Sequence, residues 1–241
     1  MQEPTFQKEM ACRERGIRTV IVGIDEAGRG PLAGPVVAVA AAYRDQAGFV
    51  VPEDIRKQFR FIRDSKTLSE KKRDEMYGFV REHFLVGTGI VHSGTIDRMN
   101  ILEATFLAMK EAVADLKRVI SAERETGAAT EDMLLLVDGN MKIPNLTLAQ
   151  EAIIDGDALV RSIAAASIVA KVTRDRMMLE YDEAYPVYGF VRHKGYGTKE
   201  HMDALRKHGA CPIHRMSFKP VFYSVPENVN RNLLTRGDRK R

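Results

Sequence analysis

Two apolar segments rich in β-branched residues flank a loop of glycine and proline near the start of the chain. Residues 19–28 (TVIVGIDEAG) and 35–44 (PVVAVAAAYR) each have the composition of a buried strand. The Gly/Pro-rich loop between them suggests that the two strands pair as a hairpin. The first strand ends on two adjacent acids, Asp25 and Glu26. Any sheet built on this hairpin therefore carries a pair of carboxylates at its rim.

The rest of the chain alternates between strand and helix patterns. Short apolar runs predict further strands at residues 84–91, 133–140 and 148–157. Apolar periodicity and helix-start signals predict helices at residues 70–83, 101–120, 162–181 and 198–208, the first of them capped by Ser69. Strands come early, helices come late and strand–helix units lie between them. We therefore expect an α/β fold, with a mixed central β-sheet flanked by helices and a small helical C-terminal extension.

One domain accounts for most of the 241 residues. We expect this domain at residues 19–225, including the C-terminal helical part. Residues 1–18 are polar, and we expect them to form a loosely held lead-in. Residues 226–241 form a basic tail, which is equally compatible with a solvated end and with a contact to nucleic acid.

Charge and cysteine content narrow the class of protein. A formal net charge of +4 fits a polyanionic partner without requiring one. Cys12 and Cys211 lie far apart and match no zinc-binding spacing, so we expect two reduced thiols. No apolar run approaches the roughly 20 residues that a membrane helix needs, and the start of the chain has no signal-peptide core. We expect a cytoplasmic protein with no membrane partner.

Four acids recur at the predicted ends of strands. Asp25 and Glu26 end the first strand, Asp138 precedes Gly-Asn, and Asp157 follows a glycine. Each alone is compatible with a turn or a helix cap, but open α/β sheets place their ligands at such strand ends. If the four converge, they form an oxygen-only site that prefers Mg²⁺ or Mn²⁺ to zinc. Two such ions activate a water and stabilise the leaving oxygen when a phosphodiester is cleaved.

The adjacency of Asp25 and Glu26 limits how both reach one metal pair. Neighbouring side chains in a regular strand point to opposite faces. Both carboxylates reach the same ions only if the strand bends or ends there, which the following glycines permit. Otherwise Glu26 binds the metal through its backbone carbonyl, or its side chain contacts the residues that bind the metal.

The loop after the first strand has the composition of a loop that contacts the sugar or phosphate groups of a nucleic acid. Gly28, Arg29 and Gly30 lack both the lysine of a P-loop and the spacing of a dinucleotide fingerprint. The two glycines permit close approach to a sugar or phosphate, and Arg29 supplies a charged donor. A tight turn with a solvated arginine explains this segment equally well.

Basic and aromatic residues elsewhere suggest contacts with a nucleic acid. Lys66 lies in a predicted loop, where it binds phosphate or is an ordinary surface lysine. Tyr196 lies between glycines and beside cations, the composition expected for stacking on a base or sugar. Arg215, in HRMSFKP, is a candidate contact to the nucleic-acid backbone.

Taken together, these motifs resemble those of ribonuclease HII, the type 2 ribonuclease H. They occur in the family's order over most of residues 19–220: GIDEAGRGPLAGPV, DSKTLSEKKR, IDRMNILEATFLAM, LLLVDGN, GDALVRSIAAASIVAKVTRD, YGFVRHKGYGT and HRMSF. The resemblance implies an RNase H-like fold and metal-dependent endonucleolytic cleavage. The implied substrates are RNA in RNA–DNA hybrids and single ribonucleotides embedded in duplex DNA, with a role in DNA replication and repair.

The resemblance also implies roles for particular residues. The family's four catalytic and metal-binding acids match Asp25, Glu26, Asp138 and Asp157. The loop that reads the 2′-OH and backbone at the RNA–DNA junction matches residues 28–30.

Two further positions match substrate contacts of the family. Tyr196 matches the tyrosine that packs on the sugar beyond the junction, and Lys66 falls in a motif associated with phosphate contact. We expect a monomer that uses two Mg²⁺ or Mn²⁺ ions. Two alternatives are a non-catalytic nucleic-acid-binding module and another metal-dependent phosphotransferase on the same fold.

Overall fold

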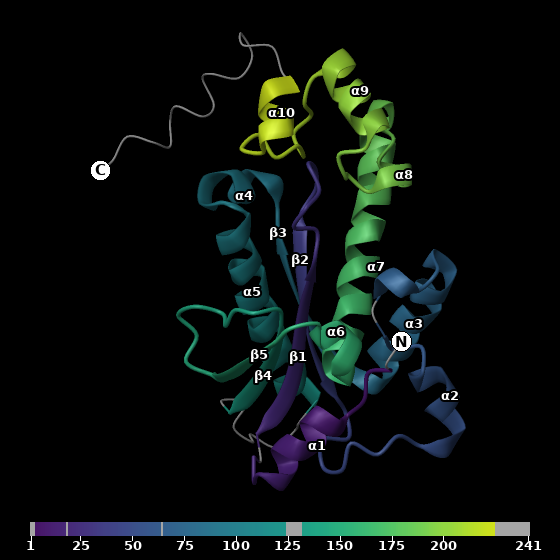
Figure 1. Ribbon diagram of the computed structural model, residues 1–241, viewed down its shortest axis with the longest axis vertical. Helices are drawn as coiled ribbons and strands as arrows, with labels where there is room; N and C mark the ends of the chain where they lie inside the picture. Colours follow the sequence, from purple (N-terminus) through teal and green to yellow (C-terminus); the bar gives the residue numbers. More distant parts are fainter. Residues whose placement is uncertain (1–2, 18, 64, 124–131, 225–241) are drawn as a thin grey trace. The chain divides into compact units, whose positions relative to one another are not determined.

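The computed structural model describes residues 3–17, 19–63, 65–123 and 132–224 (Figure 1). The chain divides into two compact units. The first contains Met1–Ala27, Val37–Ile90 and Phe106–Val172, and the second contains Gly28–Val36, Val91–Thr105 and Thr173–Arg241. The basic tail predicted at residues 226–241 lies outside the described residues.

A five-stranded sheet has the strand order β3-β2-β1-β4-β5. The strands are β1 (Val20–Ala27), β2 (Val36–Tyr43), β3 (Phe84–Val91), β4 (Met133–Asp138) and β5 (Ala149–Ile153). Strands β1 and β2 pair antiparallel, whereas β4 pairs parallel with both β1 and β5. The sheet is therefore mixed, and the predicted hairpin is confirmed.

The four helices predicted from the sequence are present. They are α3 (Glu70–His83), α5 (Ile101–Glu123), α7 (Arg161–Ala184) and α9 (Lys199–His208). Ser69 caps α3 as expected, because its hydroxyl accepts a hydrogen bond from the backbone N–H of Lys72 at 3.3 Å. The shorter helices are α1 (Gln7–Glu14), α2 (Arg56–Phe59), α4 (Ser93–Met99), α6 (Gly156–Leu159), α8 (Phe190–His193) and α10 (Lys219–Ser224).

Glycines let helices approach both faces of the sheet in the first unit. A Cβ at Gly23 of β1 would lie 2.2 Å from the carbonyl carbon of Ser162 in α7. A Cβ at Gly87 of β3 would lie 2.2 Å from the backbone nitrogen of Leu116 in α5. Residues 106–123 of α5 and 161–172 of α7 lie on opposite sides of the sheet (Figure 1). A side chain at either glycine would force the helix away from the strand.

Residues 3–17 of the lead-in contribute to the core, which corrects the expectation that this segment is loosely held. Phe6 and Cys12 are buried in the core of the first unit, and Glu9 on α1 is also buried. The Phe6 ring centroid lies 4.8 Å from that of Tyr43 and 5.3 Å from that of Phe49. Helix α1 was not predicted, because a polar segment with so few buried residues shows no clear hydrophobic period.

The second unit has a small core of its own. Its buried apolar residues are Leu32, Ala33, Met178, Tyr188, Phe190, Leu205, Ile213 and Val221. Leu32 and Ala33 come from the glycine-rich loop after β1, and the others come from α7 to α10. The predicted C-terminal helical part thus incorporates this loop into its core. None of the helices in the described residues is both long and apolar enough to cross a membrane.

Candidate active site

Strand β1 continues through both of its acids. Asp25 pairs with Val39 and Glu26 with Ala38, and the pairing ends only at Ala27. The strand predicted at residues 19–28 is therefore confirmed, and both acids lie within its pairing to β2. Because the pairing is regular, their side chains leave opposite faces of the strand. Asp25 shares the face of Gly23, which contacts α7.

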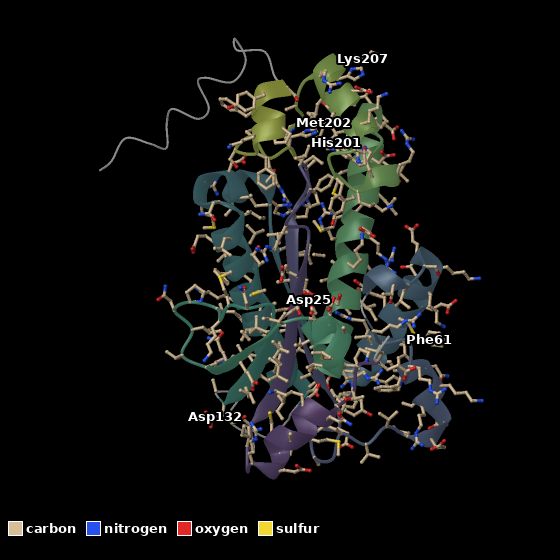
Figure 2. All side chains as sticks on the ribbon, in the orientation of Figure 1. Asp25, Phe61, Asp132, His201, Met202 and Lys207 are labelled. Carbon is tan, nitrogen blue, oxygen red and sulfur yellow. The ribbon has the colours of Figure 1, made fainter. Side chains whose placement is uncertain are left out.

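Asp138 is the last residue of the neighbouring parallel strand β4. Ile24 of β1 pairs with Val137 of β4, so the same register brings Asp25 alongside Asp138 one residue further on. Asp25 lies between β1 and α7 (Figure 2). It is only 5 % exposed. Burial raises the pKa of Asp25 well above its usual value, and the negative charges of Glu26 and Asp138 raise it further. These carboxylates form an electrostatically crowded cluster.

Hydrogen bonds hold the Asp25 carboxylate in place. Its Oδ1 accepts from the backbone N–H of Glu26 at 2.7 Å, and the Ser167 hydroxyl of α7 donates to it. Ser167 Oγ also lies 3.0 Å from Ser65 Oγ. Ser65 opens the short 3₁₀ helix Ser65–Thr67, which contains Lys66. The side chain of Lys66 lies outside the described part of the structure.

Asp157 is not at the end of a strand, which corrects the expectation from sequence. Strand β5 ends at Ile153, and Asp157 lies on the one-turn helix α6. Asp155, in the left-handed region with φ of 54°, turns the chain between them. Asp138 Oδ1 accepts from the backbone N–H of Gly156 at 2.8 Å and from that of Asp157 at 3.4 Å. Asp138 thus positions the start of the helix that carries Asp157.

The donor set has the chemistry of a site for a hard divalent cation. Among the described residues, no three His, Cys, Asp or Glu side chains are already arranged to hold a metal ion. Asp25 and Asp138 nevertheless offer carboxylate oxygens whose mutual repulsion a cation would relieve. Oxygen donors of this kind suit Mg²⁺ and Mn²⁺.

In the second unit, buried Arg215 holds the predicted recognition loop. Its guanidinium donates to the carbonyl oxygens of Gly28 at 2.6 Å, Arg29 at 3.0 Å and Gly34 at 2.9 Å. Burial and the charge of Arg174 lower the pKa of Arg215 to about 9. Arg215 is 0 % exposed. It therefore supports the loop from within, whereas the sequence analysis expected it to bind substrate directly.

Arg174, which the sequence analysis missed, is a second buried support for the loop. It donates to the carbonyl oxygens of Pro35 at 3.0 Å, Ala33 at 3.1 Å and Lys194 at 3.0 Å. A Cβ at Gly28, where φ is +102°, would lie 2.3 Å from Arg174 Nε. Only glycine fits this position. Arg174 also joins the loop to the segment that carries Tyr196.

Tyr196 and Gly30 lie side by side on the surface of the second unit. Tyr196 is 47 % exposed, and a Cβ at Gly30 would lie 3.6 Å from its Cε1 atom. Gly30 and Arg29 are also exposed. The structure therefore brings an exposed aromatic ring next to an open glycine backbone, as the recognition hypothesis requires.

Two buried histidines fix the position of the Tyr196 backbone. The Cys211 backbone N–H donates to His214 Nδ1 at 2.9 Å, and His214 Nε2 lies 3.0 Å from His201 Nε2. His201 Nδ1 lies 2.9 Å from the Tyr196 carbonyl oxygen, to which only a protonated nitrogen donates. Burial lowers the pKa of His214 to about 3 and also lowers that of His201, so both rings are neutral.

Solved structures identify the fold class. Ribonuclease H2 from Pyrococcus horikoshii OT3 has a TM-score of 0.59 at 23 % identity, covering 91 % of this chain and 99 % of that one. Bst-RNase HIII in complex with Mn²⁺ has a TM-score of 0.60 at 16 % identity, covering 92 % and 71 %. With its mixed sheet flanked by helices, the protein is RNase H-like, as predicted.

Sequence comparisons identify the family. The family described as Ribonuclease HII matches residues 22–221. The ribonuclease HII of Endomicrobium trichonymphae is 50 % identical over 202 residues, which are 83 % of this chain and 86 % of that protein. The chain therefore belongs to the ribonuclease HII family, and it is a nuclease of the ribonuclease H class.

Proposed function

We propose that the protein is a metal-dependent endoribonuclease. It hydrolyses the phosphodiester of RNA in RNA–DNA hybrids and at single ribonucleotides embedded in duplex DNA. The observation that carries this proposal is the crowding of Asp25 by the charges of Glu26 and Asp138 in a chain of this family. Carboxylates this close together repel one another, and a bound cation removes that repulsion.

Asp25, Glu26, Asp138 and Asp157 would hold two Mg²⁺ or Mn²⁺ ions. Bound in this way, such ions supply an activated water and stabilise the leaving oxygen of the displaced phosphodiester. The Bst-RNase HIII structure in complex with Mn²⁺ supports the choice of ion. Asp25 and Asp138 contribute side-chain oxygens from adjacent strands. The side chain of Glu26 points to the opposite face of β1. We therefore propose that Glu26 binds a metal ion through its backbone carbonyl, or that it contacts the residues that bind the metal ions.

The second unit would select the substrate. Residues 28–30 follow the acids after one residue, Ala27. The open backbone at Gly30 and the donor at Arg29 would read the ribose 2′-OH, which distinguishes RNA from DNA. Tyr196 would pack on the neighbouring sugar and Lys66 would contact a phosphate. Arg215 contributes by holding the loop carbonyls, so that the loop needs little ordering when substrate binds.

The cellular role we propose is the removal of ribonucleotides from DNA during replication and repair. The partners are then RNA–DNA hybrids and ribonucleotide-containing DNA duplexes. We further propose that the protein works as a monomer in the cytoplasm.

One cleavage assay tests the proposal. An end-labelled DNA duplex with a single ribonucleotide is incubated with the protein, with and without Mg²⁺, and any cut is mapped. We expect Mg²⁺-dependent incision at the ribonucleotide, none in an all-DNA duplex, and none with Asp138→Asn despite retained binding. Binding without turnover would support a non-catalytic module, and cleavage by Asp138→Asn would refute the metal assignment.

A further inference from the structure

A carboxylate outside the family match reaches the segment that follows Asp157. Glu9 lies on α1, before residue 22, where the match to the family begins. It is 0 % exposed, and its Oε1 accepts hydrogen bonds from the Ser162 backbone N–H at 3.0 Å and the Ser162 hydroxyl at 2.8 Å. The first turn of a helix leaves backbone N–H groups without intrahelical partners. Glu9 satisfies one of those of α7 from a different helix.

Thr5 holds the same junction through its backbone. Its N–H donates to the Leu159 carbonyl at 3.2 Å, and its carbonyl accepts from the Arg161 N–H at 3.0 Å. These bonds flank Val160, the residue that separates α6 from α7. Because Leu159 ends α6 and Arg161 begins α7, the lead-in fixes the angle at which the two helices join.

Ser162 is also where this junction meets the strand that carries Asp25. Gly23 of β1 has no room for a Cβ because the Ser162 backbone lies against it. Asp25 follows Gly23 by two residues on the same face of the strand, and Asp157 precedes Ser162 by five residues. The hydrogen bonds from Ser162 to Glu9 therefore influence the position of Asp157 relative to Asp25.

The chemistry at Glu9 does not fit simple packing. Glu9 Oε2 is buried and has no hydrogen-bond partner among the described residues. Burying a carboxyl group with one oxygen unpaired opposes folding, and an apolar side chain would fill the same space without that cost. What Glu9 provides is an acceptor at the start of α7.

We propose that Glu9 is a positioning residue for Asp157, acting through Ser162 and the α6–α7 junction. The proposal rests on the proposed function. It extends the functional part of the chain into the lead-in, before residue 22, where the match to the family begins. Its consequence is that metal dependence and turnover depend on a side chain that touches neither metal nor substrate.

Three variants test this role. Glu9→Ala removes the acceptor, whereas Glu9→Gln keeps an oxygen where Oε1 lies. Ile120→Val trims a buried side chain of α5 and serves as a control for general loss of stability. Each protein is measured for Mn²⁺ binding by calorimetry and for hydrogen exchange in peptides covering residues 157–163. We also measure the single-turnover cleavage rate as a function of Mg²⁺ concentration, and the affinity for substrate in the absence of divalent ions.

We expect Glu9→Ala to lower the cleavage rate and to raise the half-saturating Mg²⁺ concentration, each by about tenfold, as loss of a group that orients metal ligands does. Substrate affinity should change by less than about twofold, because the loss concerns ligand orientation and not substrate contacts. Exchange at residues 157–163 should become faster, and Glu9→Gln should restore wild-type values.

Three results would overturn the proposal. They are wild-type metal dependence in Glu9→Ala, an equal loss in Ile120→Val, and no rescue by Glu9→Gln in a folded protein. A wild-type protein that does not cut would instead refute the proposed function. In that case Mn²⁺ binding and hydrogen exchange still decide whether Glu9 positions the acidic segment.

Discussion

Arg215 Nη2 donates a hydrogen bond to the carbonyl oxygen of Gly28 at 2.6 Å, although the two residues are 187 positions apart in the chain. A guanidinium group has five N–H donors in a planar fork, and here the fork serves several carbonyls of one loop. Arg215 and Arg174 both donate to backbone carbonyl oxygens of the loop. The backbone itself is the acceptor, which ties the shape of the loop to these side chains.

Replacing Arg215 with lysine should therefore loosen the loop. A lysine keeps the charge but has no planar fork, so several buried carbonyls lose their donor. We expect a loss of roughly 1–3 kcal/mol in the free energy of unfolding, the cost of unsatisfied buried groups, and a loss of incision at a single ribonucleotide. Urea denaturation and the cleavage assay measure the two effects.

Arg29→Ala is the matched control, because Arg29 is exposed on the same loop. It should lower incision while leaving the unfolding free energy within about 0.5 kcal/mol of wild type. Equal stability loss in both variants would contradict the assignment of Arg215 to the interior of the loop.

The two glycines of the loop should respond differently to alanine. At Gly28, a Cβ would lie 2.6 Å from the Pro35 carbonyl oxygen, and φ is +102°. At Gly30, the nearest atom to a Cβ is Tyr196 Cε1 at 3.6 Å, an ordinary contact. Gly28→Ala should lower the melting temperature, whereas Gly30→Ala should fold normally and lose affinity for ribonucleotide-containing duplexes.

Thermal denaturation and fluorescence anisotropy without divalent ions separate these outcomes. If Gly30→Ala binds and cuts like the wild type, close approach of substrate to the Gly30 backbone is excluded. If Gly28→Ala is as stable as the wild type, the close packing on Arg174 does not hold in solution.

The sheet and the long helices were predictable because their patterns are local. Strands β1, β2, β3 and β4 consist mainly of apolar residues and glycine, and α5 shows apolar residues every three or four positions over its length. The one-turn helix α6 was not predictable, since a segment this short has no period. Asp157 was therefore assigned to a strand end when it belongs to the helix that follows.

In the candidate site, too, only the residues with a local sequence signal could be predicted. The acids stood out because carboxylates interrupt apolar strands. Arg174, His201 and His214 did not, because their partners include backbone groups and, for the histidines, each other's rings. A backbone acceptor leaves no mark on the sequence at its own position, so only the folded chain could identify these three residues.

Removing the charge of Asp25 should stabilise the metal-free protein. Its carboxylate is buried, and the charges of Glu26 and Asp138 raise its pKa. Asp25→Asn keeps an oxygen for the Glu26 N–H and relieves the repulsion. We expect Asp25→Asn to be more stable than the wild type at pH 8 in EDTA, because the substitution removes both a buried charge and its repulsion by two neighbouring carboxylates.

The same variant should lose cleavage and the stabilisation that Mg²⁺ gives the wild type. Ser167→Ala is a useful comparison, because it removes a hydrogen bond to Asp25 without removing the charge. A melting temperature of Asp25→Asn below that of the wild type in EDTA would show that repulsion does not dominate at this position.

The final prediction concerns the pH dependence of stability at Glu9. Burial raises the pKa of Glu9 above its usual value of 4.5, against the opposing effects of the Ser162 hydrogen bonds and the Arg161 charge. The native state then holds the Glu9 proton more tightly than the unfolded state. Its contribution to stability is greatest below pH 4.5 and falls as the pH rises towards the raised pKa. Glutamine does not titrate.

The stability difference between Glu9→Gln and the wild type should therefore grow in favour of the glutamine as the pH rises, and then level off above the raised pKa. Urea denaturation of both proteins at pH intervals from about 4 to 8 measures this difference directly, since all other titrating groups are shared. A difference that shrinks with rising pH would mean that Arg161 and the α7 N-terminus stabilise the Glu9 carboxylate more than burial opposes it. Glu9 would then accept the Ser162 hydrogen bonds as a stabilised carboxylate.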